Sequence, residues 1–428
     1  MTYLDAFKLF SFVLSVILTI FYLYQLIYIL YSIVKHDVPK VEDSGKKNRF
    51  AIFISARNEA GVIGELLTSL NNQTYDHNYY DIYLCADNCT DNTGEVAKKY
   101  GATVYERENH ELVGKGYALN YMYHLVCEDK GADYYDAFMV FDADNIVDEH
   151  FIEEVNKKFS TGKYDALTTY RNSKNFGQNW LTAAYSIWFL HEARHLNYTR
   201  DSLNAQCMIS GTGFVVSSAL MKENEGWPYY FLTEDIQFSV ASTLKNKRIG
   251  YCHYAMLYDE QPATMSQSWK QRLRWSKGFY QIDGKYIGSL IKGIFKSKGS
   301  KRLAHYDVLM TILPCSLLTI ALIIIAIWTF MAAWFMPYYV KLVFRSEVGS
   351  ILLTTLINYW LGLSFMGLIT VSQEWKRIRE DSWTKIKYIP LFPLFMLTYI
   401  PLAIEAMFVK VKWTPIQHYS TKELSQKK

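Results

Sequence analysis

Two carboxylates at the end of a predicted strand carry the clearest chemistry in this chain. Asp142 and Asp144 follow an apolar run at residues 137–141, so a buried strand is expected to end beside them. Two carboxylates at this spacing can share a hard cation that also binds a diphosphate. The same Asp-x-Asp pattern occurs in solvated loops, but its position at a strand end favours a metal site.

A second acidic pair and a basic-aromatic run follow further along the chain. Glu234 and Asp235 begin a predicted helix, where an acid often only compensates the helix dipole. A carboxylate that faces a cleft there can instead act as the general base for an acceptor hydroxyl, and both interpretations stay open. Arg274 can form a bidentate pair with a phosphate, and Trp275 can stack on a sugar ring. Taken alone, these two residues favour an interfacial tryptophan beside a snorkelling arginine.

Polar residues also stand at other predicted strand ends. The loop at residues 55–59 precedes a predicted helix, whose N-terminus would offer backbone N–H groups to an anion or a base edge. Asp87 ends the next strand and can accept a hydrogen bond from the imide N–H of uracil. Lys115 lies between Gly114 and Gly116, which suits a phosphate but lacks the spacing of a Walker loop. Helix capping and solvated turns are the competing interpretations at these places.

These residues require a framework of alternating strands and helices. The strands are predicted at residues 50–55, 81–87, 102–106, 137–142, 164–170 and 213–217, and the helices at residues 58–71, 90–100, 116–128, 178–198 and 265–295. This order predicts an α/β fold, with a mostly parallel, doubly wound sheet and helices on both faces. Ligands bind such sheets beyond the carboxyl ends of the strands, where Ser55, Asp87 and Asp142 fall.

Long uncharged stretches flank this polar segment. Residues 9–34, 309–336 and 349–373 carry no charge, and each exceeds the roughly 20 apolar residues that cross a bilayer. Residues 388–404 are shorter and contain three prolines, which predicts a kinked span or a re-entrant element. Basic residues follow the first stretch and precede the second, so the segment between them is expected in the cytosol. The net charge of +4 is too small to indicate nucleic acid.

The helix at residues 265–295 and the C-terminal region complete this arrangement. Apolar residues of the helix, among them Trp269, Tyr286 and Leu290, are expected to dip into lipid while its lysines meet anionic headgroups. Three full spans after the cytosolic segment would put the C-terminus outside, but the lysines of the tail favour the inside. Residues 388–404 are therefore expected not to cross.

Seven short sequences occur here in the order typical of one enzyme family. They are ARNE (56–59), ADNCTD (86–91), GKGYALN (114–120), FDAD (141–144), SGTG (210–213), TED (233–235) and QRLRW (271–275). In these motifs the chain resembles the membrane-integrated inverting glycosyltransferases of family 2, which have a GT-A fold and include cellulose, chitin, hyaluronan and poly-N-acetylglucosamine synthases. The resemblance covers about residues 50–280 and the flanking spans. Ser55 stands where a proline is usual, and residues 88–90 replace a more typical Gly-Ser pattern.

The resemblance implies a role for each candidate residue. Asp235 would be the catalytic base, and Asp144 would ligate Mg²⁺ or Mn²⁺ on the diphosphate of a UDP-sugar donor. The donor would be bound by Ser55, Arg57, Glu59, Asp87, Lys115, Asp142, Gln271 and Arg274, and the acceptor by Ser210, Gly211, Glu234 and Trp275.

The resemblance also implies an organisation and a reaction. The expected parts are a transmembrane anchor (1–35), a cytosolic GT-A domain (36–263), amphipathic interface helices (264–305), a transmembrane region (306–410) and a basic tail (411–428). The main hypothesis is a multi-pass plasma-membrane enzyme, in contact with membrane lipids, that polymerises a saccharide processively; the QRLRW run favours it. The alternative is a single transfer onto a polyprenyl-phosphate or other lipid acceptor. An inactive membrane scaffold is the third hypothesis, against which the intact aspartates argue. The donor sugar, the linkage and the oligomeric state stay open.

Overall fold

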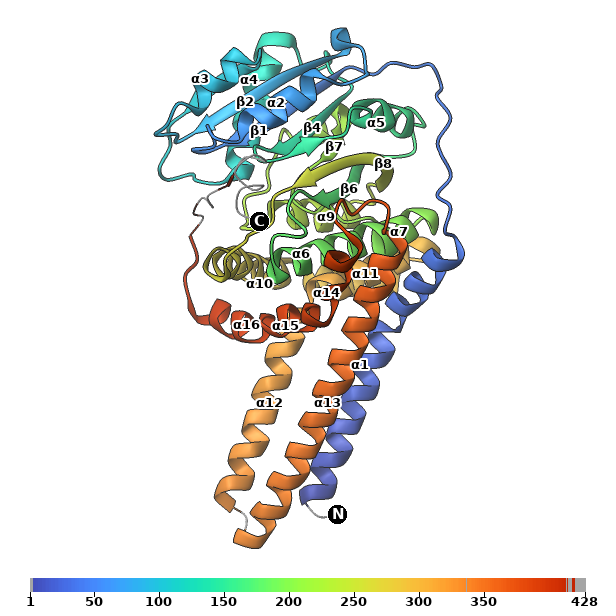
Figure 1. Ribbon diagram of the computed structural model, residues 1–428, viewed down its shortest axis with the longest axis vertical. Coiled ribbons are helices and arrows are strands. Elements are labelled where there is room, and N and C mark those ends of the chain that lie inside the picture. Colours follow the sequence, from blue (N-terminus) through green and yellow to red (C-terminus); the bar gives the residue numbers. More distant parts are fainter. Residues whose placement is uncertain (1–2, 336, 413, 415–417, 420–428) are drawn as a thin grey trace.

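An eight-stranded sheet frames the polar part of the chain in the computed structural model, which describes residues 3–335, 337–412, 414 and 418–419 (Figure 1). Its order is β3-β2-β1-β4-β7-β6-β8-β5. The strands are β1 (Phe50–Ala56), β2 (Tyr80–Asp87), β3 (Thr103–Arg107), β4 (Ala137–Asp142), β5 (Ile146–Val147), β6 (Ala166–Ser173), β7 (Phe214–Ser217) and β8 (Ile249–Asp259). Strands β1 to β4 pair in parallel, β7 is antiparallel to its neighbours, β6 pairs in parallel with β8, and β5 is antiparallel to β8. The predicted α/β fold with a mixed, mostly parallel sheet is confirmed.

Strand β1 shows why the sheet lies between two layers of helices. Its side chains alternate between the faces. Phe50 and Ile52 pack in one apolar cluster, while Ala51 and Phe53 pack in another on the opposite face. Such a continuous apolar run is typical of parallel strands that are covered on both sides. The covering helices and short turns include α2 (Ile63–Asn71), η1 (His77–Tyr79), α3 (Thr93–Lys99), α4 (Lys115–Lys130), α5 (Phe151–Phe159), α8 (Ser218–Glu223) and α9 (Glu234–Leu244).

Three of the differences from the prediction concern α2, β8 and the helix expected at residues 178–198. Helix α2 begins at Ile63 rather than at residue 58, because Asn58 has a left-handed backbone (φ 59°) that no α-helix accommodates. Strand β8 escaped prediction because it is buried on both faces and shows no polar–apolar alternation. The helix expected at residues 178–198 is α6 (Trp180–His191), a six-residue π-helix η2 (Glu192–Asn197) and α7 (Tyr198–Ser202).

Long apolar helices run side by side away from the sheet (Figure 1). They are α1 (Tyr3–Val34), α12 (Pro314–Phe335) and α13 (Tyr338–Gln373). Within the described residues, three stretches are long and apolar enough to cross a membrane by length and composition: Asp5–Val34, Lys341–Gln373 and Ser382–Phe408. Several side chains of α12 lie outside the described part, as does Met336 at the end of the predicted second span.

The third of these stretches does not continue as one straight helix. It is divided into α14 (Ser382–Lys387), η3 (Ile389–Leu391), α15 (Phe392–Leu397) and α16 (Tyr399–Phe408). Figure 1 shows α15 and α16 lying across the direction of α12 and α13, beneath the sheet domain. Beyond them, the described residues His418 and Tyr419 contact Glu59 and Glu260 of that domain. Since Ser382–Phe408 is also long and apolar enough to span, the expectation that residues 388–404 do not cross stays a prediction.

The expectation that the apolar side of residues 265–295 dips into lipid is wrong for most of the side chains on which it rested. Helix α10 (Met265–Lys296) packs its apolar side on α11 (Gly299–Ile312) and on α16. Leu290 is fully buried, Tyr286 packs in the same cluster, and the Trp269 indole donates to Glu405 (2.8 Å). Amphipathic spacing indicates an apolar side, but other helices can cover it as well as lipid can.

A buried ion pair joins the sheet domain to the membrane-side helices. Arg200 of α7 donates from Nε and Nη2 to the two carboxylate oxygens of Asp307 in α11, at 2.8 and 2.7 Å. Tyr28 of α1 donates to the same carboxylate at 3.0 Å. The Arg200 side chain is 1% exposed and the Asp307 side chain 0%. Water therefore cannot solvate either charge if the partner is removed.

We predict that Asp307→Asn destabilises the protein by about 3–5 kcal/mol, because it leaves the Arg200 charge buried without a counter-ion. The measurement is the thermal unfolding midpoint of the detergent-solubilised protein. Glu106→Gln is the control, because it removes an ion pair whose side chains are exposed, Glu106 by 73% and Lys98 by 55%. This change is expected to alter stability by less than about 0.5 kcal/mol. Equal midpoints for the two variants would contradict the prediction.

Candidate active site

One cavity of about 840 Å³ at the carboxyl edge of the sheet contains every predicted site residue. Strand ends supply part of its wall, the starts of α4 and α9 supply another, and α10 closes one side. The predicted residues that line it are Ser55, Arg57, Glu59, Asp87, Lys115, Asp142, Asp144, Ser210, Gly211, Glu234, Asp235, Gln271, Arg274 and Trp275. The structure therefore brings all of them together, while the role of each stays a prediction.

The Asp-x-Asp carboxylates at the end of β4 have different surroundings. Asp142 forms an ion pair with Lys115 (2.5 Å), whose ammonium also donates to the carbonyl of Gly211 (2.8 Å). Burial opposes the ammonium charge, but the carboxylates of Asp142 and Glu234 outweigh it and raise the pKa of Lys115. Asp144 is almost fully buried, and its Oδ2 accepts from the backbone N–H of Glu260 at 3.2 Å.

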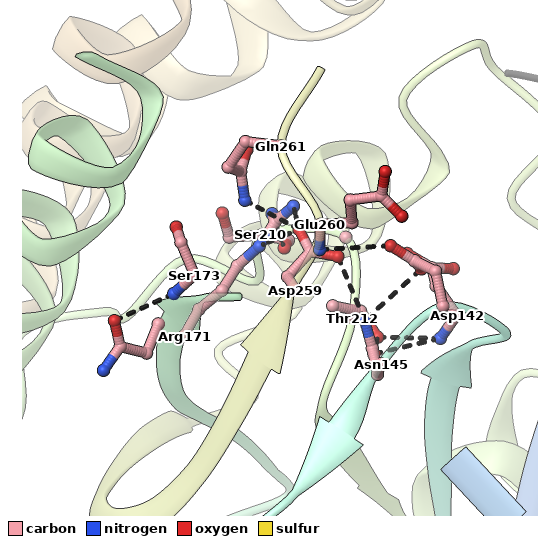
Figure 2. Close-up of polar contacts among 12 residues, drawn as sticks. Asp142, Asn145, Arg171, Ser173, Ser210, Thr212, Asp259, Glu260 and Gln261 are labelled. Atoms are coloured by element: carbon pink, nitrogen blue, oxygen red, sulfur yellow. Dashed lines mark hydrogen bonds and ion pairs between the residues drawn. The ribbon is translucent and has the colours of Figure 1, made fainter. Parts of the chain in front are cut away.

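A polar network behind these carboxylates escaped the sequence analysis (Figure 2). The carboxylate of Asp259, at the end of β8, accepts from Asn145 (3.0 Å), from Gln261 (3.1 Å) and from Arg171 Nε (2.9 Å). Burial raises the pKa of Asp259 to about 6, although Arg171 opposes the shift. The network fixes Asn145 beside Asp144, so it sets the position of the predicted metal ligand from behind. Because β8 was not predicted, no local signal marked Asp259.

The first turn of α9 places two acids at the cavity wall. Asp235 is half-buried, and its Oδ2 lies close to the backbone of Gly211, whose φ is +81°. Burial raises the pKa of Asp235, and burial together with the Asp235 charge raises the pKa of Glu234 to about 7. A carboxylate whose pKa is raised in this way holds a proton more strongly, as a general base requires.

The wall formed by α10 and by the start of α9 contains polar atoms without partners. Within the described residues, Thr233 Oγ1, Gln271 Oε1 and Arg274 Nε are buried and make no hydrogen bond. Such atoms typically cost about 1–3 kcal/mol each unless a ligand or water satisfies them. Trp275 lies beside them, edge-on to Tyr185 and Phe189 at ring distances of 6.0 and 6.4 Å. Arg274 and Trp275 both line the cavity, and the choice between a ligand contact and an interfacial anchor stays a prediction.

The loops after β1 and β2 are joined at the far end of the cavity. Asn58 Oδ1 accepts from the backbone N–H of Thr90 at 2.7 Å, and Asn88 adopts a left-handed backbone (φ 52°). Asparagine tolerates this conformation, which explains how the loop turns without the glycine expected there. Asp87 is buried against Arg107 at 2.5 Å.

The structure bears on two predicted details at strand ends, and the first of them is wrong. Residues 57–62 separate β1 from α2, so the loop at residues 55–59 does not open directly into a helix N-terminus. The Gly114-Lys115-Gly116 turn does open α4, which begins at Lys115, and the missing side chain of Gly116 allows close packing, while the phosphate role of the turn stays a prediction. A Cβ at Gly116 would lie 2.0 Å from the carbonyl oxygen of Tyr229.

His418 is a second residue that sequence reasoning missed. Its Nδ1 lies 3.0 Å from the carboxylate of Glu59, and the next backbone N–H, of Tyr419, donates to Glu260 (2.8 Å). Burial alone would lower the pKa of His418, but the carboxylates of Asp144, Glu59 and Glu260 raise it to about 10. The imidazolium therefore occupies a place where three carboxylates attract positive charge.

The donor set fits a divalent cation that is bound together with a diphosphate. Mg²⁺ is typically held by one or two carboxylates while phosphates and water complete its shell, and Asp142 and Asp144 offer such oxygens. Within the described part of the chain, no group of three or more His, Cys, Asp or Glu residues is arranged to hold a metal by itself.

Known proteins with similar sequences and folds include several glycosyltransferases. A beta-monoglucosyldiacylglycerol synthase from Nostoc sp. (strain PCC 7120 / SAG 25.82 / UTEX 2576) is 26% identical over 275 residues, covering 62% of this chain and 56% of the relative. A poly-beta-1,6-N-acetyl-D-glucosamine synthase from Staphylococcus aureus (strain MSSA476) is 24% identical over 265 residues, covering 59% of this chain and 58% of the relative. The match thus spans a little more than half the length of these curated relatives.

A solved structure shares the fold. The mannosyltransferase PcManGT from Pyrobaculum calidifontis, in complex with GDP-Man and Mn²⁺, superposes with a TM-score of 0.54 at 15% identity, covering 86% of this chain and 98% of that one. The family model described as "Glycosyltransferase like family 2" matches residues 48–278, which is more than half of the chain and includes the sheet, both acidic pairs and the α10 wall. The chain therefore belongs to glycosyltransferase family 2.

Proposed function

We propose that this protein is a UDP-sugar-dependent, inverting hexosyltransferase at the cytosolic face of the plasma membrane. The observation that carries the proposal is the cavity whose walls include Asp144, Asp235, Gln271 and Arg274 together. Family membership supports sugar transfer, and the solved relative holds a sugar nucleotide and Mn²⁺. A screen of several UDP-sugars, with released UDP as the readout, tests the proposal; no UDP release from any donor would contradict it.

The proposed reaction is a single displacement. The acceptor hydroxyl oxygen bonds to the anomeric carbon opposite the diphosphate, the bond from that carbon to the diphosphate oxygen breaks, and the configuration inverts. Asp235 takes the hydroxyl proton, and the Arg274 guanidinium balances charge on the departing UDP. A Mg²⁺ or Mn²⁺ ion held by Asp144 would neutralise part of that charge.

The proposed setting includes the membrane. The long apolar helices support a multi-pass protein in contact with lipids, and the basic residues around the sheet domain support a cytosolic location for it. The division into parts at residues 1–35, 36–263, 264–305, 306–410 and 411–428 belongs to this proposal.

Two acceptor classes suit this chemistry. The position of Trp275 beside Arg274 supports a growing saccharide, which favours a processive synthase of an exported polysaccharide. The aliphatic side chains at the membrane end of the cavity support a lipid acceptor and a single transfer. The relatives include both a glucosyldiacylglycerol synthase and a polysaccharide synthase. The size of the product made by purified protein from one labelled donor separates the two classes.

Asp144→Asn is expected to abolish turnover and to remove the metal-dependent part of UDP binding, because an amide is a poorer ligand for a hard cation. Calorimetric titration of UDP with Mn²⁺ and with chelator measures this. Asp129→Asn, a change at an exposed carboxylate of α4, is the control. Full activity of the Asp144 variant, or of the wild type in excess chelator, would rule out the metal role.

Asp235→Asn is expected to lower the transfer rate by about 10²–10⁴-fold while UDP-sugar still binds, because the amide cannot accept the proton. Since burial raises the pKa of Asp235, the wild-type rate should fall with decreasing pH at values above the usual carboxyl range. The variant should lack this acid limb. Near-normal turnover would mean that Asp235 only compensates the helix dipole.

Trp275→Ala is expected to reduce the amount or length of product more than it weakens UDP binding. Burial of one sugar face on an indole is worth roughly 1–2 kcal/mol at about 25 cal/mol per Å². UDP affinity and product size are compared with those of Trp383→Ala, a change at a tryptophan that is 69% exposed. Lost UDP affinity with unchanged product would instead assign Trp275 to the donor.

A further inference from the structure

The catalytic cavity continues into a region with aliphatic walls. This apolar arm adjoins the part of the cavity that contains Asp235, and its residues come from the junction of α11 and α12, from α13, and from α15 and α16. They are Ile312, Pro314, Leu352, Leu356, Met396, Leu397 and Ile400. From Leu352 to Tyr359, the cavity follows α13 for about 10 Å at the usual helical rise.

The apolar arm reaches the outer side of α13. At their far ends α1, α12 and α13 are in contact through aromatic rings. The centre of the Phe7 ring in α1 lies 5.9 Å from that of Trp328 in α12 and 5.2 Å from that of Phe344 in α13. Nearer the sheet domain, Leu352 and Leu356 line the cavity and yet are 55% and 42% exposed. A hydrocarbon chain in a bilayer therefore has a path into the arm.

Polar groups line the cavity beside this arm. Ser210 Oγ donates to Glu192 Oε2 at 2.9 Å, and Arg200 Nη2 donates to Thr311 Oγ1 at 3.0 Å. All four side chains line the cavity. A ligand in this place therefore meets hydrogen-bonding groups at one end and aliphatic carbon at the other.

Three of the cations that line the cavity already have carboxylate partners, and Arg274 is the cation proposed to bind the donor diphosphate. Lys115 pairs with Asp142, Arg171 with Asp259, and Arg200 with Asp307. A phosphate at the polar end would meet the charge of Glu192 and Asp235 with these three cations already neutralised, which disfavours an anionic acceptor. A saccharide in the arm would bury hydroxyl groups against aliphatic walls without partners, which is also unfavourable.

We infer that the apolar arm holds the hydrocarbon chains of an uncharged lipid alcohol whose free hydroxyl group reaches Asp235. This inference rests on the proposed function, since it names the acceptor class for that same site. The sugar is transferred to the lipid hydroxyl, the proton passes to Asp235, and UDP leaves. The product is a neutral glycolipid that can leave through the same lateral opening.

Leu356→Trp tests the inference because it fills the arm without touching the donor site. Full-length protein is reconstituted into phosphatidylcholine vesicles that contain dioleoylglycerol, and labelled sugar from a panel of UDP-sugars is measured in the organic phase. We expect lipid-linked sugar in the wild type and an at least tenfold loss in the variant, with unchanged UDP affinity. Leu361→Trp is the matched control: it lies on the same helix, is 62% exposed and does not line the cavity, so it should act like wild type.

Other outcomes would overturn the inference. Equal lipid product from the Leu356 and wild-type proteins would remove the arm from acceptor binding. Preference for undecaprenyl phosphate would show that the acceptor is anionic, and a water-soluble polymer made without dioleoylglycerol would show that it is a saccharide. In both of these cases, the release of UDP would still support the proposed sugar transfer. The absence of metal-dependent UDP-sugar binding and of UDP release with every acceptor would instead contradict the proposed function, and the inference with it.

Discussion

The ion pair between Lys115 and Asp142 is the contact on which the geometry of the cavity depends. Asp142 ends β4, the strand at which the parallel part of the sheet meets the antiparallel part. Lys115 begins α4, and its second hydrogen bond holds the carbonyl of Gly211. One ammonium group thus ties together a strand end, a helix start and the loop that faces Asp235. Because the Lys115 side chain is only 13% exposed, the attraction is stronger than between two fully solvated groups and helps to fix the distances among these elements.

The same arrangement recurs around the cavity. Arg107, Arg171 and Arg200 each pair with one carboxylate, and these pairs lie at places where separate elements meet: β2 with β3, β6 with β8, and α7 with α11. Buried pairs of this kind contribute little net stability compared with apolar contacts, but removal of one partner is costly. They therefore specify which elements lie next to each other, while the two apolar clusters on the faces of the sheet supply most of the stabilisation.

Much of the site could be predicted because it depends on local patterns. Apolar strands that end in polar residues place Ser55, Asp87 and Asp142 at one edge of a parallel sheet, and the structure gathers all the predicted residues in one cavity. Their roles still await the experiments above. Asp259 and His418 could not be found in this way. The first depends on where β8 inserts in the sheet, and the second lies far along the chain from the carboxylates that it contacts.

The packing of α10 shows a related limit. Periodicity correctly predicted a helix with one apolar side, but it carries no information about what covers that side. In the structure α11 and α16 cover it, and these helices also bring Ile312 and Ile400 to the cavity. Tertiary context, rather than the helix itself, therefore decides whether a tryptophan such as Trp275 meets lipid or a bound ligand.

The π-helix between α6 and α7 has a consequence for how this segment can change during evolution. A π-helical turn corresponds to one residue inserted into an α-helix. Deletion of one residue from η2 would restore a regular helix and rotate α7 relative to α6 by roughly 100°. After this rotation, Phe189 and Glu192 could no longer face the cavity if Arg200 kept its contact with Asp307. A single inserted residue thus links the shape of this cavity wall to the attachment of the sheet domain on the long apolar helices, so neither can change in evolution independently of the other.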